Sequence, residues 1–421
     1  MSHIQGNVQD RIQQPLLRAR WSAAPAWCLV ATMAFARVVA DPADVAAARA
    51  RIEALGGGAA CAGDAAGNLT EIVIPDGSGV TADDVALFGR LDGLRKLHVL
   101  NCRGLDDEAV ARLTGLAGLE SLALTNSGIG DAAVETIAAS FPGLVELDLS
   151  SNVNFTGAAM RPIAALAKLR RLTLVQTRFN DLHTRRLAKL SELEALDLRG
   201  NMEAGDMTLG VAGRLPKLRA LKHRSSVATD EGLAALAQSP ALESLLAQDF
   251  AITSASGAHL AGLAGLTSLE IFRCQGFGSE GVLALAPLKK LGRLTLRDLP
   301  EVGDGGLAVL AELPALTRLS LHELASVGDA GLAHLAAAPG LEVLDIWSLP
   351  RMTDASVAVI AALPNLRELS IRETGATERS LAALAGMPKL VSLTFKNSAV
   401  SPDVAAKVKA AKAWKKLDLG T

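Results

Sequence analysis

Aromatic side chains are scarce in this 421-residue sequence, and so is an excess of charge of either sign. There is no Tyr, and aromatic residues make up only 3% of the chain although hydrophobic residues make up 50%. The apolar side chains are therefore mainly Leu, Ala and Val, which suits many small, similar layers better than one large irregular core. A net charge of −2 offers no global attraction to nucleic acid or to an anionic membrane.

Cysteine is also scarce, with four residues and no C-x-x-C pair, which argues against a disulfide scaffold and against zinc or iron–sulfur binding. The glycine run 56–58 has no preceding strand and no G-K-[ST] sequence, so it does not resemble a phosphate-binding loop. No Ser or Cys nucleophile with a recognisable local motif occurs. We therefore expect no enzymatic activity, no cofactor and no metal.

A short apolar run lies near the N-terminus. Arg18 and Arg20 precede an uncharged stretch of 16 residues, 21–36. As a helix this stretch would span about 24 Å, less than the ~30 Å core of a bilayer. Small residues before and at Ala40 suit a signal peptidase. We predict a cleaved signal peptide over residues 1–40, export to the periplasm, cell surface or medium, and no membrane span in the mature chain. An uncleaved membrane anchor and an ordinary N-terminal helix of a cytoplasmic protein are the alternatives.

From residue 69 onward the pattern L-x-x-L-x-L recurs at steps of 24 or 25 residues. Within it, Leu172, Thr173 and Leu174 alternate as in a strand, with Leu toward the core and Thr outward. Farther along each unit the apolar spacing becomes helical, as at Leu307 and Leu310. The fifteen units start at Leu69, Leu94, Leu119, Leu144, Leu169, Leu193, Leu218, Leu242, Leu266, Leu291, Leu316, Leu341, Leu366, Leu390 and Trp414.

A helix-start signal lies between the two patterns. A carboxylate in the first helical turn is favoured by the free amides and by the helix dipole. One acid per layer does not converge on a point, so we interpret these residues as helix-capping groups and not as metal ligands. Eight repeats carry the acid, as Asp107, Asp131, Asp181, Asp206, Asp230, Asp304, Asp329 and Asp354.

One such unit cannot bury its leucines alone, but a stack of units can. The repeat therefore predicts an α/β solenoid: an arc with a parallel β-sheet on its concave face and helices on its convex face. Fifteen strands at ~4.8 Å would give a sheet roughly 70 Å long. We assign residues 1–40 to the signal peptide, 41–68 to an N-terminal capping segment and 69–421 to an array of about fifteen repeats.

Repeats of this form resemble the leucine-rich repeat family, and within it the cysteine-containing type, L-x-x-L-x-L-x-x-[CN]. Segments 94–102, 144–152 and 266–274 carry that pattern. Cys102 and Cys274 would then be buried thiols about 34 Å apart, too far for a disulfide. Unlike a strict cysteine ladder, this chain has other residues in the same column, at Ser127, Thr177, Asn201, Leu299, Leu324 and Leu349.

The resemblance implies a non-catalytic protein-binding scaffold. In this subclass, F-box adaptors recognise ubiquitin-ligase substrates with their repeats, and bacteria carry exported members. We expect a monomer that binds an unidentified protein partner and no nucleic acid. A substrate-recognition adaptor, a host-directed effector inside a cell and a carbohydrate-binding surface protein are the alternatives. No F-box-like segment precedes the repeats in this sequence, which argues against the adaptor.

The candidate partner-binding surface comes from the residues that alternate with the core leucines. The last such position is small in the first half of the array and becomes aromatic and basic from Phe272 to Lys396. Exposed Trp and Arg side by side are typical of binding hot spots. The alternative is a solvated strand face on which Arg stacks on Trp for local reasons. The candidate residues are Phe272, Arg293, Arg297, Arg318, His322, Asp345, Trp347, Arg372 and Lys396.

Overall fold

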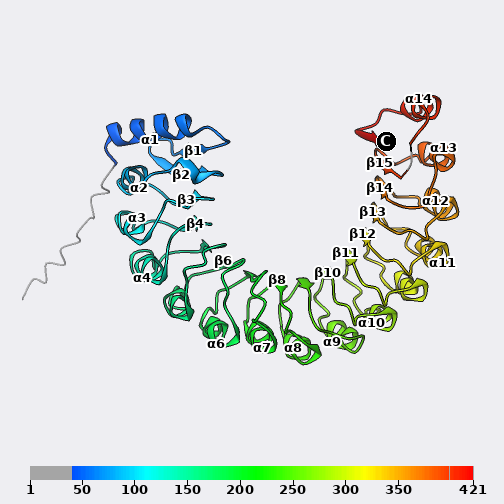
Figure 1. Ribbon diagram of the computed structural model, residues 1–421, viewed down its shortest axis with the longest axis horizontal. Coiled ribbons are helices and arrows are strands. Elements are labelled where there is room, and N and C mark those ends of the chain that lie inside the picture. Colours follow the sequence, from blue (N-terminus) through cyan, green and yellow to red (C-terminus); the bar gives the residue numbers. More distant parts are fainter. Residues whose placement is uncertain (1–39, 398, 421) are drawn as a thin grey trace, which may run out of the picture. The chain divides into compact units, whose positions relative to one another are not determined.

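The structure is a computed structural model that describes residues 40–397 and 399–420. These residues form one compact unit with a 16-stranded sheet, in which the strands follow chain order from β1 to β16. Strand β1 pairs antiparallel with β2, and every later pair is parallel. Within this unit the sheet lies on the inner side of the curve and the helices on the outer side (Figure 1). The predicted solenoid is confirmed, while the predicted signal peptide lies outside the described residues except for Ala40.

The elements alternate along the chain as the repeat predicts. The strands are β1 (Ala60–Gly63), β2 (Leu69–Ile74), β3 (Lys96–Val99), β4 (Ser121–Leu124), β5 (Glu146–Asp148), β6 (Arg171–Thr173), β7 (Ala195–Asp197), β8 (Ala220–Arg224), β9 (Ser244–Gln248), β10 (Ser268–Phe272), β11 (Arg293–Arg297), β12 (Arg318–His322), β13 (Val343–Trp347), β14 (Glu368–Arg372), β15 (Ser392–Lys396) and β16 (Lys416–Leu419).

The outer layer combines α-helices with short 3-10 helices. The α-helices are α1 (Pro42–Leu55), α2 (Ala82–Phe88), α3 (Asp107–Ala111), α4 (Asp131–Ser140), α5 (Met160–Ile163), α6 (Asp181–Thr184), α7 (Asp206–Arg214), α8 (Asp230–Leu236), α9 (Ser256–Ala261), α10 (Ser279–Leu283), α11 (Asp329–Leu332), α12 (Asp354–Ala361), α13 (Leu381–Ala385) and α14 (Pro402–Ala410). The 3-10 helices are η1 (Gly77–Gly79), η2 (Gly157–Ala159), η3 (Arg185–Lys189), η4 (Asp304–Glu312), η5 (Ala333–Ala337) and η6 (Glu378–Ser380). Within the described residues, no helix is both long enough and apolar enough to cross a bilayer.

The core consists of leucine columns that run from strand to strand. Leu294, Leu319 and Leu344 are direct register partners on β11, β12 and β13, and all three are fully buried. Leu344 and Ile346 also point inward, in agreement with the alternation expected for a strand. Because every repeat supplies the same columns, the apolar interior continues through the whole array.

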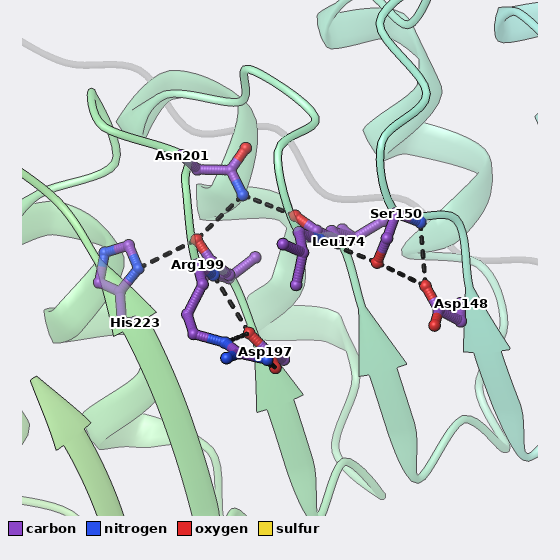
Figure 2. A network of polar contacts seen from close by, with 9 residues as sticks. Asp148, Ser150, Leu174, Asp197, Arg199, Asn201 and His223 are labelled. Carbon is purple, nitrogen blue, oxygen red and sulfur yellow. Dashed lines mark hydrogen bonds and ion pairs between the residues drawn. The ribbon is translucent and has the colours of Figure 1, made fainter. Parts of the chain in front are cut away.

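The position at which the chain turns away from each strand carries a second buried column. In the first half of the array it is polar, as at Asn201, whose amide donates to the carbonyl oxygens of Leu174 at 2.6 Å and Leu198 at 3.0 Å (Figure 2). Cys102 and Cys274 occupy the same column as free, buried thiols, as predicted. Burial raises the pKa of each thiol to about 12.

The repeated aspartates lie in the first helical turn as predicted, but their principal partners are in the next repeat. Asp329 accepts hydrogen bonds from the backbone N–H of Thr353 at 2.9 Å and from its hydroxyl at 2.6 Å. Thr353 is itself the N-cap of α12, where its hydroxyl accepts from Ala355. Each such acid therefore links two neighbouring layers, a role that the helix-capping interpretation missed.

The segment before the first leucine repeat covers the N-terminal end of the array. Asp41 caps α1, and Ala48 and Ile52 of that helix are buried. Arg51 donates to the Asp84 carboxylate at 2.7 Å and so joins α1 to α2. Strand β1 adds a sixteenth strand to the fifteen that the repeat predicts.

Candidate functional site

The strand register places one row of side chains along the concave face of β10–β14. Phe272, Arg297, His322, Trp347 and Arg372 are successive register partners, and Lys396 on β15 continues the row. The leucine, isoleucine or phenylalanine before each of them is buried. Because side chains alternate along a strand, the row itself must face out of the core.

Cation–π contacts join this row. The Arg297 guanidinium lies 4.3 Å from the centroid of the Phe272 ring and 5.1 Å from that of Trp347. Arg372 approaches Trp347 from the other side at 5.7 Å, and Arg273 stacks on Phe272 at 4.5 Å. One guanidinium thus bridges two aromatic rings that lie three strands apart, on β10 and β13. Stacking of this kind holds both rings and charged groups in place.

A polar triad lies beside the indole. His322 Nε2 is 3.0 Å from Asp345 Oδ2, and Arg372 Nη2 is 3.2 Å from Asp345 Oδ1. Burial alone would raise the pKa of Asp345, but hydrogen bonds from His322 and Ser370 and the charge of Arg372 outweigh it and lower the pKa to about 2. The His322 ring meets Trp347 edge to face at 5.9 Å.

Trp347 is less exposed than the sequence predicts. Its side chain is half-buried, because Arg297, His322 and Arg372 all lie against the indole. Sequence spacing identifies which residues share the row, but not how far each side chain folds over its neighbour. The indole is therefore a supported side chain with part of its surface in solvent.

Two further side chains that contact this row come from turn positions that the sequence analysis did not select. Arg273 and Glu323 directly follow β10 and β12 with left-handed backbones, at φ values of 54° for both. Arg273 stacks on Phe272, and Glu323 Oε2 accepts from Arg297 Nε at 2.8 Å. The recurrence of charged residues at this turn position, as at Asp249 and Asp298, was the available signal.

The remaining candidate residues are two arginines at the start of β11 and β12 and the lysine at the end of the row. Arg293 and Arg318 are exposed register partners at the first positions of β11 and β12, whereas Arg297 and His322 of the row are at the last positions. Lys396 pairs with Asp418 on β16 at 2.9 Å. It lines a polar hollow of about 480 Å³ over β13–β16, together with Glu368, Ser370 and Thr394.

In the first half of the concave face, polar side chains pair with one another. Ser150 donates to Asp148 at 2.6 Å, and Arg199 pairs with Asp197 at 2.8 Å (Figure 2). Burial raises the pKa of Asp148, the hydrogen bonds of Ser150 act against that shift, and the charge of Asp197 adds to it.

Three polar side chains on β3, β4 and β5 are joined by hydrogen bonds and contain the residue types of a catalytic triad. Ser121 lies 2.7 Å from His98 Nε2 and donates to Glu146 Oε2 at 2.8 Å. The serine is in the middle, whereas nucleophile activation needs the imidazole between serine and carboxylate. This order does not activate Ser121. Within the described residues, no three His, Cys, Asp or Glu side chains gather as metal ligands would.

Comparison with known protein families is decisive for the fold. A family model described as a leucine-rich repeat region matches residues 121–418, well over half of the chain. This chain belongs to the leucine-rich repeat family. Comparison with curated protein sequences gives no match. The cysteine-containing subclass remains an expectation from the sequence.

Solved structures agree with this leucine-rich repeat assignment. An internalin from Listeria monocytogenes is 18% identical with a TM-score of 0.54, and the alignment covers 91% of this chain and 96% of that one. The Rad7 and Elc1 complex in yeast is 19% identical with a TM-score of 0.51, covering 77% and 80%. A TLR13 complex with a single-stranded RNA is 18% identical with a TM-score of 0.50, covering 78% and 52%. At these identities the likeness concerns the fold alone.

Proposed function

We propose that this leucine-rich repeat protein is a non-catalytic scaffold that binds a protein partner on the concave face of β10–β14, with Trp347 at the centre of the contact. The observation that supports this most directly is the supported indole: Arg297 and Arg372 stack on its ring and His322 lies against it. Trp and Arg dominate the energetics of many protein interfaces. Side chains already held in place lose less entropy on binding.

The composition of the two halves supports the same surface. In a chain with 3% aromatic residues, the row holds both Phe272 and Trp347 on the concave side. The corresponding positions, just after β4, β5 and β6, are Thr125, Ser150 and Val175. Family membership and the Rad7–Elc1 neighbour, a complex of two proteins, favour a protein partner. The neighbour crystallised with RNA keeps nucleic acid as an outcome of the test, although the net charge of −2 argues against it.

A photo-crosslinking residue in place of Ser320, which lies between Arg318 and His322 on β12, would identify the partner. The same substitution at Thr173 on β6 is the control. Trp347→Ala should then weaken the affinity for that partner by at least ~2 kcal/mol. Because the indole is half-buried, we expect a loss of folding stability of about 1 kcal/mol or less. Thr125→Ala is the matched change in the first half and should leave binding unchanged. Unaltered affinity in Trp347→Ala would disprove the proposed contact.

We also propose that the protein is exported after cleavage near Ala40 and acts as a monomer. The basic residues and apolar stretch before Asp41 support export. Intact-mass measurement in cell fractions tests it, and full-length protein found only in the cytosol would favour an intracellular effector or adaptor. Sedimentation at micromolar concentration tests the monomer.

A further inference from the structure

Two arginines on the concave face are placed side by side without a counter-ion. Arg293 and Arg318 are direct register partners on β11 and β12, and both are exposed. Among the residues that the structure describes, neither side chain makes an ion pair or a hydrogen bond. Like charges directly opposite each other on neighbouring strands destabilise a sheet. No contact within the described part of the chain therefore offsets the repulsion between these two arginines.

Two other arginines on neighbouring strands of this face are paired. Arg297 has Glu323 and Arg372 has Asp345. In the column just before Arg293 and Arg318 along each strand, earlier layers form cross-strand ion pairs, such as Arg170 with Glu194 and Arg219 with Glu243. At the arginine pair that column changes to the uncharged residues Thr267, Gly292 and Thr317. The layers of Arg293 and Arg318 therefore have no carboxylate in that column.

The surface between the arginine pair and the stacked row is small and polar. Thr295 and Ser320 are half-buried register partners at the middle of β11 and β12. Glu270 and Asp345 occupy the same middle position on the two flanking strands. These flanking carboxylates would repel a long polyanion, such as a nucleic acid or a sulfated polysaccharide, that crossed several strands. A localised anion carried by a protein suits the site better.

The dimensions agree with a helix. Neighbouring strands are ~4.8 Å apart, close to the ~5–6 Å between side chains three or four residues apart on a helix. Positions 293 and 297 are separated by four residues of strand, roughly 13 Å, and a helix with its side chains is ~10–12 Å wide. A helix lying across the strands over Thr295 and Ser320 would thus meet the arginine pair on one side and the stacked row on the other.

We propose that Arg293 and Arg318 bind two carboxylates, three or four residues apart, on an acidic amphipathic helix of the partner protein. This inference rests on the proposed function, because it assigns chemistry to one edge of the same surface. The helix would use its acidic edge for register and its apolar edge for contact with Phe272 and Trp347. Guanidinium groups suit this role because they bind carboxylates in a bidentate manner.

The test uses the full-length chain and two synthetic helical peptides of about 20 residues. One has Glu at positions i and i+4 beside a Leu and Phe face, and the other has Gln in place of both Glu residues. We expect the wild type to bind the Glu peptide about tenfold more tightly at low salt. Arg293→Gln with Arg318→Gln should abolish that preference. Arg171→Gln, an exposed unpaired arginine in the same column on β6, is the matched control and should retain it.

A preference that survives in the double variant would overturn the inference. It would equally fail if a phosphoserine peptide or a heparin oligosaccharide bound through the same two arginines more tightly than the Glu peptide. Removal of two like charges should not lower the melting temperature, so a loss of binding with a retained melting temperature reports on contact. If Trp347→Ala weakens binding to the crosslinked partner while the double variant does not, only the acidic-helix inference fails. If Trp347→Ala has no effect, the proposed function fails whatever the arginine result.

Discussion

The region β3–β7 and the region β10–β14 share one leucine core but end their strands in different ways. In the first region the turn column contains buried amides, and Asn152 donates to the carbonyl oxygens of Leu124 and Leu149 at 2.8 and 2.9 Å. In the second the column holds the fully buried Leu299, Leu324 and Leu349 after β11, β12 and β13. The same layer thus closes either with hydrogen bonds to the turn carbonyls or with additional apolar contact.

The two regions also differ in what they leave open on the concave face. Ser121 of the first region binds His98 and Glu146, and Arg199 binds Asp197. The second region adds aromatic rings and an unpaired arginine pair to its internal ion pairs. A regular repeat therefore sets the core while leaving the outward positions free to differ, and the difference lies where a partner would bind.

The largest expected effect tests what the two regions share. Leu319→Asp and Leu147→Asp each place a carboxylate in a fully buried position. We expect each to reduce the free energy of unfolding by about 4 kcal/mol, because a buried charge without a partner is strongly disfavoured. Urea unfolding measures both. A negligible effect at either position would contradict a single continuous core.

The next prediction exchanges the two kinds of turn column. Asn201→Leu removes donors from the carbonyls of Leu174 and Leu198, and we expect a loss of about 3 kcal/mol. Leu324→Asn buries an amide where leucine now packs, with a loss of similar size. Thermal unfolding compares the two variants with the wild type. If either exchange is tolerated, the column identity is not a structural requirement and the first contrast between the regions disappears.

The period of 24 or 25 residues was enough to predict the solenoid, the leucine columns and the membership of the concave row. It could not predict β1, because Ala60–Gly63 carries no leucine pattern. Side-chain partners were also out of reach. Asp329 binds Thr353 and Arg297 binds Glu323 across neighbouring layers, and those contacts depend on rotamers and turn geometry rather than on spacing. For the same reason the sequence did not predict that neighbouring side chains partly bury Trp347.

Two concave-face carboxylates should respond oppositely to pH. The pKa of Asp345 lies at about 2 instead of 3.8, so its stabilisation is complete above about pH 4 and is lost as the pH falls toward 2. Asp345→Asn should thus cost about 2 kcal/mol at pH 7 and much less near pH 2. The pKa of Asp148 is raised, so its ionised form destabilises the fold as the pH rises through that pKa.

Asp148→Asn is the matched control. Its stability relative to the wild type should increase with pH, the reverse of the trend for Asp345→Asn. Urea unfolding between pH 2 and pH 7 provides both curves. Parallel curves for the two variants would show that the His322 and Arg372 contacts do not set the ionisation of Asp345.

The smallest expected effect concerns the left-handed turn that follows each strand. Ser151 and Glu323 have φ values of 61° and 54°, a conformation that glycine adopts without the steric penalty of a Cβ atom. Ser151→Gly should stabilise the fold by about 0.5 kcal/mol, the strain relieved less the added entropy of the unfolded chain. Glu323→Gly relieves the same strain but removes the ion pair with Arg297, in which both side chains are 34% exposed. A partly exposed pair contributes at most about 1 kcal/mol.

We therefore expect Glu323→Gly to be neutral or slightly destabilising, while Ser151→Gly raises the melting temperature. The Nε–H of Arg297 should also exchange faster with water once the Glu323 carboxylate is gone. Equal gains in both variants would mean that this ion pair adds nothing to stability. Arg297 would then be held between Phe272 and Trp347 by stacking alone. The turn residue Glu323 of the second region would then add no more to stability than Ser151 of the first.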